Sequence, residues 1–504
     1  MRYFNTSGPC DPAEHYTVMR PALIVKGREK VRRGRYFTLF APRQAGKTTY
    51  FQLLMRELGD EYTPIWVSFE NLKTVSKEVF YQDFDHQIKQ ELSAYQITAD
   101  DAVNNPSSLA VFFEKIPCRK PVVLFIDEFE GIPDSVLSEL MHTFRKMYHR
   151  KDYHVLHSVV LVGVSTIAEL VVSSASPFNI VDELKISYFT DEEIREMIGQ
   201  YVAESGQEFT KDVIRAIYEN TKGQPGLVCG LCQYLTEEVA TDISKPVTME
   251  HFYRTLTHFL TERYDKNIIN IVQKAKEKKS FMIRLLFDEK PVPFSVDDPD
   301  MSYLSAHGVI ENVNGVADIP VPMYVKRLIT AFRPLFNGEG GHYAADIRET
   351  FGEYLTQDGL NISALLNRYS EYVRRRGFKA FDTEHLKEAA WHYSLDGFIT
   401  FFIGCLGGQT FIEVPSGRGR TDILILYGNN KYIIETKIFS SSLYFEKGKK
   451  QLAQYLESER ISEGYYVVFS NKHTEADMLY SEEEINGKRI FTYVIRTCFE
   501  RPSE

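Results

Sequence analysis

The chain has 504 residues and a mass of 58.2 kDa, and at roughly 100–200 residues per domain this length predicts about three domains. Apolar residues make up 43% and charged residues 25%, which excludes a disordered tail protein, a collagen-like repeat and a coiled-coil rod. The net charge of −10 argues against a basic coat for DNA, but it leaves local DNA binding open.

The sequence shows no clear pattern of a membrane span, a secretory signal or a disulfide scaffold. The longest uncharged apolar run, Phe398–Gly408, falls well short of the roughly 20 residues that span a bilayer. The N-terminal residues lack the apolar core of a secretory signal, and six cysteines are too few for a disulfide scaffold. We therefore expect a cytoplasmic protein with no membrane partner.

The first third of the chain alternates strands with helices. Nearly continuous apolar runs suit strands that are buried on both faces of a parallel sheet. Such runs occur at Tyr36–Phe40, Thr63–Phe69, Pro121–Ile126 and Ser158–Ser165, with a helix over Thr48–Leu58 after the first. The pattern predicts a doubly wound α/β domain, and Thr190 followed by three acidic residues predicts the start of a helical segment.

The rest of the chain reads as a small α/β region followed by a second sheet. Residues 270–335 hold a helix and a hairpin around Asn314-Gly315, which fits a winged helix. Helices are expected from about 344 to 380 and from 383 to 405. Strands are expected near 410–414, 421–427, 431–437, 464–469 and 490–496, with a helix over Glu446–Glu459 among them.

A phosphate-binding loop lies between the first strand and its helix. Its main-chain N–H groups can cradle phosphates, Lys47 can reach the β- and γ-phosphates, and the Thr48 hydroxyl can bind Mg²⁺. Ala41 stands where this pattern usually has glycine. The candidate ATP-binding residues of the loop are Ala41, Arg43, Gln44, Ala45, Gly46, Lys47, Thr48 and Thr49.

Two acids follow the third strand and complete the nucleotide site. Asp127 is predicted to hold Mg²⁺, and Glu128 to orient the attacking water as a general base. Ser165, at the end of the fourth strand, is a candidate contact for the γ-phosphate or the water.

Residues 30–230 resemble AAA+/STAND-type ATPases, specifically the group called AAA-like. The resemblance rests on Gly34–Phe37, Ala41–Gln44, Leu124–Glu128, Ser176–Ile180 and Gly223–Gly226. It implies an ATP-dependent switch with a lid that closes over nucleotide, a winged helix afterwards, and a homo-oligomer. It also implies that Gln224 and Pro225 contact the nucleotide from the lid.

A carboxylate–lysine pattern appears in the C-terminal block. Asp422 begins one strand and Glu435 nears the end of the next, and a tight turn makes the two strands antiparallel, so both carboxylates meet at one end of the hairpin. Glu435 and Lys437 are two residues apart and share one face. Carboxylate oxygens suit Mg²⁺ or Mn²⁺, and Lys437 can position a water and offset developing charge. The chemistry indicated is metal-dependent phosphodiester hydrolysis.

These residues resemble the PD-(D/E)XK nuclease superfamily. The resemblance covers roughly 385–470 and assigns catalytic roles to Asp422, Glu435 and Lys437. It adds Glu413 as a further metal ligand, and Gln451 and Tyr455 on the following helix as site residues.

The expected organisation is an ATPase core with an N-terminal loop (1–190), a helical lid (191–265), a winged-helix-like domain (266–335), a linker (336–342) and a nuclease-like domain with preceding helices (343–504). The expected function is an ATP-regulated DNA endonuclease in defence or mobile-DNA processing, with ATP and Mg²⁺ or Mn²⁺ as cofactors. Two alternatives stay open: a STAND-type adaptor whose C-terminal domain binds nucleic acid or a partner without cleaving, and a DNA-translocating motor.

Overall fold

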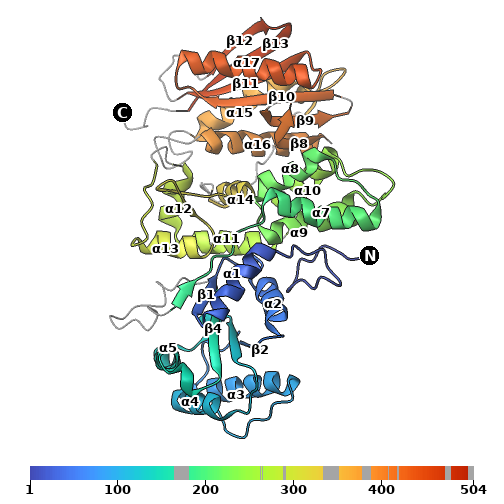
Figure 1. Cartoon of the computed structure of the whole chain (residues 1–504). Helices are drawn as coiled ribbons and strands as arrows, with labels where there is room; N and C mark the ends of the chain where they lie inside the picture. Colours follow the sequence, from blue (N-terminus) through green and yellow to red (C-terminus); the bar gives the residue numbers. More distant parts are fainter. Residues whose placement is uncertain are drawn as a thin grey trace, which may run out of the picture. The chain divides into compact units, whose positions relative to one another are not determined.

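The structure is a computed structural model, and it divides the chain into two compact units (Figure 1). The first unit comprises Met1–Lys274 and Phe294–Met323, and the second comprises Ala275–Pro293 and Tyr324–Glu504. The structure describes residues 1–163, 181–261, 263, 265–287, 291–332, 351–376, 388–406, 408–416, 419–428, 430–470 and 478–497. The predicted linker at 336–342 and Ser165 lie outside these ranges.

A parallel five-stranded sheet forms the centre of the first unit. Its order is β2-β3-β4-β1-β5, and every neighbouring pair is parallel. The strands are β1 (Tyr36–Phe40), β2 (Thr63–Ser68), β3 (Val122–Asp127), β4 (Leu156–Gly163) and β5 (Val181–Glu183). The continuous apolar runs are confirmed as strands buried on both faces, because β1 and β3 bury every residue.

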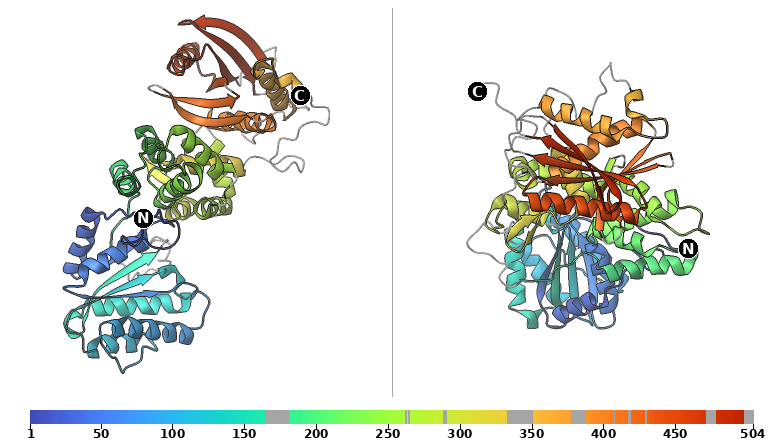
Figure 2. Two further views of the ribbon diagram at one scale, coloured as in Figure 1. Left: turned by 90° about the vertical axis from the view of Figure 1, so that its right-hand side faces the viewer. Right: turned by 90° about the horizontal axis from the view of Figure 1, so that it is seen from above.

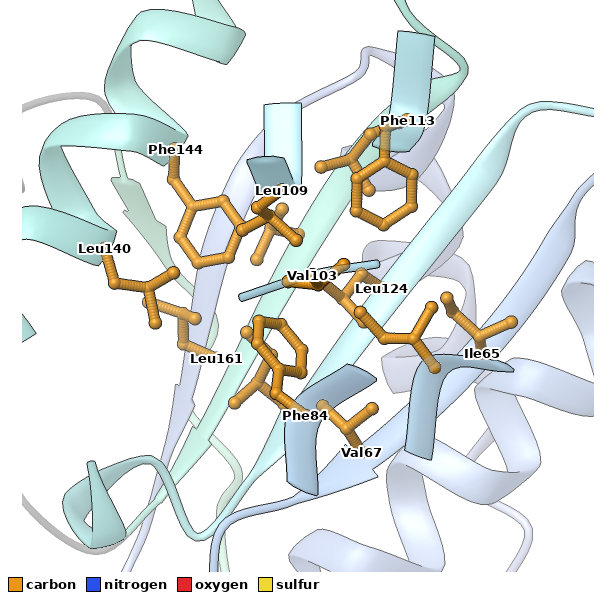
Figure 3. Close-up of a cluster of buried hydrophobic side chains, with 14 of the residues drawn as sticks. Ile65, Val67, Phe84, Val103, Leu109, Phe113, Leu124, Leu140, Phe144 and Leu161 are labelled. Carbon is orange, nitrogen blue, oxygen red and sulfur yellow. The ribbon is translucent and has the colours of Figure 1, made fainter. Parts of the chain in front are cut away.

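Helices cover both faces of this sheet (Figure 2). On one face lie α3 (Lys77–Ala94), α4 (Pro106–Lys115) and α5 (Asp134–Tyr148), and on the other lie α1 (Pro21–Arg32) and α2 (Lys47–Leu58). Figure 3 shows the larger core, where Phe84, Leu109 and Phe144 from the helices meet Leu124 and Leu161 from the strands. The packed sheet fixes the strand ends that carry the nucleotide site.

Short helices follow the sheet. They are α7 (Asp191–Ser205), α8 (Lys211–Thr221), α9 (Pro225–Tyr234) with a π-helical turn at Leu235–Val239, and α10 (Met249–Thr261). Thr190 caps α7 as predicted, because its side chain accepts from the Glu193 amide while the Glu193 side chain accepts from the Thr190 amide. Next come α11 (Lys266–Glu277), α12 (Lys279–Phe287), α13 (Pro299–Ala306), the hairpin β6 (Glu311–Val313) and β7 (Val316–Asp318), and α14 (Pro322–Phe332).

A mixed six-stranded sheet of order β12-β13-β11-β10-β9-β8 dominates the second unit. Its strands are β8 (Gln409–Ser416), β9 (Gly419–Tyr427), β10 (Asn430–Ile438), β11 (Glu463–Ser470), β12 (Met478–Ile485) and β13 (Lys488–Arg496). The strand β12 was not predicted, because its Ser481–Glu484 run is polar; β12 lies at the edge of the sheet, where such residues can face solvent.

Helices of the second unit pack on opposite faces of its sheet. On one face, Trp391 of α16 (Glu388–Cys405) stacks on Phe469, and Tyr369 of α15 (Ile362–Arg376) contacts the same ring. On the other face, α17 (Ser442–Ser458) places Phe445 against Tyr466 of β11. Helices are expected from about 344 to 380. In the described part of that range, a 3₁₀ turn at Phe351–Tyr354 and a turn closed by the Leu355–Leu360 bridge precede α15, so the segment is not continuously helical.

None of the helices in the described ranges has both the length and the apolar character needed to span a bilayer.

Gly131 provides a test of the close packing between the turn that follows β3 and the main chain of Phe69. It lies in the 3₁₀ turn η1 (Phe129–Gly131), and a Cβ atom there would come within 1.9 Å of the Phe69 carbonyl oxygen. We expect Gly131→Ala to lower the free energy of unfolding by about 1–3 kcal/mol, because a main-chain contact cannot give way like a side chain. The control is Gly199→Ala in α7, where the added methyl meets nothing within 4 Å and should stabilise by about 0.5–1 kcal/mol. Chemical denaturation measures both, and equal effects would contradict the prediction.

Candidate functional site

The phosphate-binding loop connects β1 to α2 as predicted. Gln44 (φ 54°) and Gly46 (φ 83°) adopt left-handed conformations, and α2 begins at Lys47. The Lys47 ammonium donates to the carbonyl oxygens of Ala41 at 2.8 Å and Pro42 at 3.0 Å. Burial lowers the pKa of Lys47, and the nearby acids Glu130, Glu128 and Asp127 oppose that shift. The loop therefore keeps the Lys47 ammonium against main-chain carbonyl oxygens of the segment that is expected to bind phosphates.

The acids after β3 lie beside this loop. Asp127 Oδ2 accepts from the Thr48 hydroxyl at 3.5 Å, and Asp127 Oδ1 accepts from the Glu128 amide at 2.9 Å. Burial raises the pKa of Asp127 to about 6, with the neighbouring Glu128 charge adding to the shift. Burial, together with Glu130, also raises the pKa of Glu128, whose main chain is left-handed (φ 49°). A hydroxyl beside a carboxylate is a donor set that Mg²⁺ prefers, so these residues fit the ion.

Glu130 is a residue of this site that the sequence did not single out. It lines the same cavity as Lys47 and Glu128. A Cβ atom at Gly163, the last residue of β4, would lie 2.4 Å from Glu130 Oε2, so glycine makes room for the carboxylate. Its only sequence signal is its position two residues after Glu128.

Gln224 contacts the phosphate-binding loop itself. Its fully buried side chain caps α9 by accepting from the Leu227 amide at 2.6 Å, and it donates to the carbonyl oxygen of Gln44 at 3.2 Å. The Gly226 amide donates to the same carbonyl at 3.2 Å. Pro225 and Gly226, rather than Gln224, are the residues of this turn that line the cavity.

The N-terminal segment closes the cavity on another side. The Cys10 amide donates to the Thr49 hydroxyl at 2.9 Å. Arg20, left-handed at φ 52°, pairs with Glu193 of α7 at 2.9 Å and donates to the Ser187 carbonyl at 2.8 Å. The resulting cavity has a volume of about 820 Å³ and is lined by residues 5–10, the loop 43–50, Glu128, Glu130, Pro225 and Gly226, among others. This volume is within the range of ligand pockets, roughly 300–1,000 Å³.

The three candidate acids of the second unit lie on three adjacent strands of its sheet, Glu413 on β8, Asp422 on β9 and Glu435 on β10. The main-chain pairs of β9 and β10 run up to Ile434–Ile423, and Asp422 and Glu435 lie directly beyond that pair, at the same end of the hairpin. Glu435 pairs with Tyr466 of β11, and Tyr466 contacts Phe445 of α17, so Glu435 lies on the α17 face. The side chain of Glu413 lies outside the described residues.

Lys437 joins the two described carboxylates. Its Nζ lies 3.2 Å from Glu435 Oε1 and 3.8 Å from Asp422 Oδ2. Glu435 is fully buried, whereas Lys437 and Asp422 are half-buried. A buried charge is stable only when it is paired, and the Lys437 ammonium is the cation that the structure places beside Glu435. In the described part of the chain, no three His, Cys, Asp or Glu side chains gather in a group that could hold a metal ion.

Other contacts reach the same hairpin. Thr436 donates to Asp422 Oδ2 twice, from its amide at 2.7 Å and from its hydroxyl at 2.8 Å. The buried His392 of α16 lies on the other side of that hydroxyl, with its Nδ1 at 3.1 Å. On α17, Gln451 donates to the Tyr455 hydroxyl at 2.5 Å, which agrees with their expected position on one helix face. His392 was not found from the sequence, because it lies 44 residues from Thr436.

Residues 8–325 match the family model of the AAA-like domain. The chain belongs to this family. It is therefore a P-loop ATPase, and ATP is the nucleotide that its loop is built to bind. Residues 361–473, which include Asp422, Glu435 and Lys437, match a family described as a domain of unknown function (DUF8371). No curated protein matches the chain.

Several solved structures are similar to the chain at low identity. A Walker-type ATPase of Pyrococcus abyssi has 14% identity and a TM-score of 0.48, covering 64% of this chain and 99% of its own. The Thermotoga maritima RuvB Holliday junction branch migration motor has 15% identity and a TM-score of 0.35, covering 60% and 90%. Cdc6p of Pyrobaculum aerophilum has 14% identity and a TM-score of 0.36, covering 64% and 96%. Scores this low carry no argument about activity.

Asp127 predicts a pH-dependent stability. Its pKa is about 6 in the fold against an ordinary 3.8, so the folded state keeps a proton that the unfolded chain loses between about pH 4 and 6. Stability conferred by this group is therefore present at low pH and is lost as the pH rises through about 6. We expect Asp127→Asn to raise the stability of the nucleotide-free protein by up to about 3 kcal/mol at pH 7.5 but by only about 1 kcal/mol at pH 4.5, where the folded side chain is still protonated. Denaturation at both pH values measures this.

The matched control for Asp127→Asn is Asp134→Asn. The Asp134 side chain is 86% exposed, so its stability change should not depend on burial. A gain at Asp127 that is equal at both pH values would contradict the assignment.

Gln224 predicts a link between the α9 cap and nucleotide affinity. We expect Gln224→Ala to lower stability by about 0.5–2 kcal/mol, because the α9 cap is lost, and also to weaken ATP binding, because the Gln44 carbonyl loses a partner. Thr190→Ala is the control, since it removes the cap of α7 by the same kind of bond at a residue that bonds to Glu193 of its own helix and not to the phosphate-binding loop. Equilibrium ATP binding measured on both variants distinguishes them, and equal affinities would contradict a role at the loop.

Proposed function

We propose that this AAA-like ATPase is a metal-dependent nuclease whose activity depends on its nucleotide state. The observation that carries the proposal is the lysine ammonium within 3.8 Å of two carboxylates on neighbouring strands, one of them fully buried. A fully buried carboxylate such as Glu435 is costly to maintain for stability alone. Its retention on one face of a sheet supports a chemical role.

The ATPase half of the proposal assigns roles to the loop and to the acids after β3. Lys47 leaves the carbonyl oxygens of Ala41 and Pro42 to contact the β- and γ-phosphates. Glu128, whose pKa is raised by burial and by Glu130, orients the water that attacks the γ-phosphate and accepts its proton. Thr48 and Asp127 hold the Mg²⁺ that accompanies ATP.

The nuclease half concerns hydrolysis of a phosphodiester. Water attacks phosphorus, one P–O bond forms, and the opposite P–O bond breaks to release an alcohol and a phosphomonoester. Asp422 and Glu435, with oxygens of Glu413, suit Mg²⁺ or Mn²⁺, which supplies an activated water and offsets phosphate charge when bound. Lys437 orients the water and stabilises the charge that develops on the phosphate oxygens. Gln451 and Tyr455 on α17 are proposed to fix the substrate.

The substrate we propose is DNA, and the biological setting we propose is defence or the processing of mobile DNA. A cytoplasmic homo-oligomer is the proposed assembly, because nucleotide sites of AAA+ proteins are often shared between subunits. These assignments follow from the family resemblance of the residues, and the tests below address the chemistry first.

One observation favours the second candidate, an adaptor ATPase that does not cleave. Asp422 Oδ2 already accepts two bonds from Thr436 and faces Lys437, and the described side chains contain no three-ligand metal group. The same residues could then form a stable ion-paired hairpin that binds a partner.

Cleavage assays separate the two candidates. We expect the full chain to cut plasmid or single-stranded DNA with Mg²⁺ or Mn²⁺, and Lys437→Ala to reduce the rate by about 100-fold or more, because one charge-stabilising donor is lost. Lys431→Ala is the matched control: Lys431 lies on the same strand, half exposed, and pairs with Glu459 at 3.3 Å. Cleavage retained in Lys437→Ala would point to a contaminating nuclease, and loss of cleavage in both lysine variants would point to general damage.

Nucleotide dependence is read in the same assay. Lys47→Ala should abolish ATP binding, whereas Glu128→Gln should bind ATP without hydrolysing it. A rate of cleavage that differs between these two variants establishes that the bound state, not turnover, sets the activity. Absence of cleavage under every metal and nucleotide condition, with ATP hydrolysis intact, would leave the adaptor as the function.

A further inference from the structure

We propose that Thr436 and His392 are positioning residues that orient the Asp422 carboxylate, a role that rests on the proposed nuclease function. Thr436 is the middle residue of the Glu435–Lys437 pattern, and the pattern itself gives this position no role. In the structure it contacts Asp422 more closely than Lys437 does, at 2.7 and 2.8 Å against 3.8 Å.

Thr436, the hydrogen-bond partner of Asp422, and His392, which contacts the Thr436 hydroxyl, are both buried. Thr436 is 1% and His392 6% exposed, so water does not compete for these hydrogen bonds. The main-chain pairs of β9 and β10 run up to Ile423–Ile434, and just beyond them the Thr436 amide donates to the Asp422 side chain. The Asp422 carboxylate therefore accepts a main-chain hydrogen bond just beyond the last β9–β10 pair, and this bond ties the orientation of the carboxylate to the backbone.

The direction of each hydrogen bond follows from chemistry. An ionised carboxylate only accepts, and the Thr436 hydroxyl has a single proton, so that proton goes to Asp422 Oδ2. The hydroxyl must then accept from His392, which requires a proton on His392 Nδ1. The chain His392 Nδ1–H to Thr436 Oγ1–H to Asp422 Oδ2 has one consistent direction, and it fixes the tautomer of the histidine.

The chain also connects the two faces of the sheet. By strand alternation Thr436 belongs to the face opposite Glu435 and Lys437, and His392 reaches it from α16. Glu435 and Lys437 lie on the α17 face, while the α16 face supplies Thr436 and His392, which hold Asp422. Residues that orient a ligand in this way typically affect metal affinity by 10–100-fold when they are removed.

The test uses variants that differ in one atom or one donor. Thr436→Val keeps the shape and the amide bond but removes the hydroxyl, and Thr436→Ser restores it. His392→Phe removes the Nδ1 donor, and His392→Asn returns an N–H donor at a similar distance from the backbone. The matched control is Thr410→Val, because Thr410 is also buried and its hydroxyl bonds to Thr400 of α16 at 2.5 Å.

Two readouts are taken on the full chain: Mn²⁺ affinity by calorimetry, and DNA cleavage separated into kcat and KM. We expect Thr436→Val and His392→Phe to weaken Mn²⁺ binding by about 10–100-fold and to lower kcat, with KM for DNA little changed. Thr436→Ser and His392→Asn should recover most of the affinity, and Thr410→Val should behave as the unsubstituted chain. Thermal melting of each variant identifies any that fail to fold.

The outcomes distinguish the inference from the function on which it rests. If Asp422→Asn abolishes Mn²⁺ binding and cleavage while Thr436→Val and His392→Phe retain both, the positioning role is wrong and the nuclease stands. Loss in Thr410→Val equal to that in Thr436→Val also overturns it, since the effect would then be general packing. If the unsubstituted chain neither binds Mn²⁺ nor cleaves DNA, the nuclease function fails and the positioning role fails with it.

Discussion

Desolvation of carboxylates is the constraint on which both candidate sites depend. Asp127 is buried at the end of β3, and Glu435 is buried within β10. A buried carboxylate loses most of its hydration. The cost of an unpaired buried charge is several kcal/mol, so each acid needs a cation or a set of donors nearby. In the first unit Lys47 lies among the acids after β3, and in the second Lys437 lies between Asp422 and Glu435. One lysine with more than one acid recurs at both sites.

The two sheets place these groups by the same rule. In a parallel sheet the carboxyl ends of adjacent strands meet at one edge, and β1, β3 and β4 bring the loop, Asp127 and Gly163 together there. In the second sheet, register sets the site: Glu435 pairs with Tyr466 of β11, and the β9–β10 pairs end at Ile423–Ile434, which brings Asp422 within reach of the Thr436 amide and Lys437. A shift of one residue in β10 would turn Glu435 and Lys437 to the α16 face and Thr436 to the α17 face.

Candidate site residues that lie close together in the sequence could be predicted from it. The loop around Lys47, the acids after β3 and the Glu435–Lys437 pair are each defined within a few residues, and the chain folds them as a strand end or a single strand face. Glu130, Arg20 and His392 could not be found this way, because their partners are far along the chain: Glu193 for Arg20 and Thr436 for His392. The edge strand β12 was missed for a different reason, since its polar residues carry no alternation that a buried face would impose.

The turn before α9 and the proposed phosphate contacts share one stretch of main chain. The carbonyl oxygens of Ala41 and Pro42 receive Lys47, and two residues later the Gln44 carbonyl receives Gln224 and Gly226. In the proposed binding mode, phosphates draw Lys47 away from the carbonyl oxygens of Ala41 and Pro42, two residues before the Gln44 carbonyl that Gln224 and Gly226 contact. Cys10 and Arg20 hold the cavity from the N-terminal side through Thr49 and α7. The proposed binding mode therefore couples the phosphate contacts to the helices that contact the loop, which is the property a nucleotide-dependent switch requires.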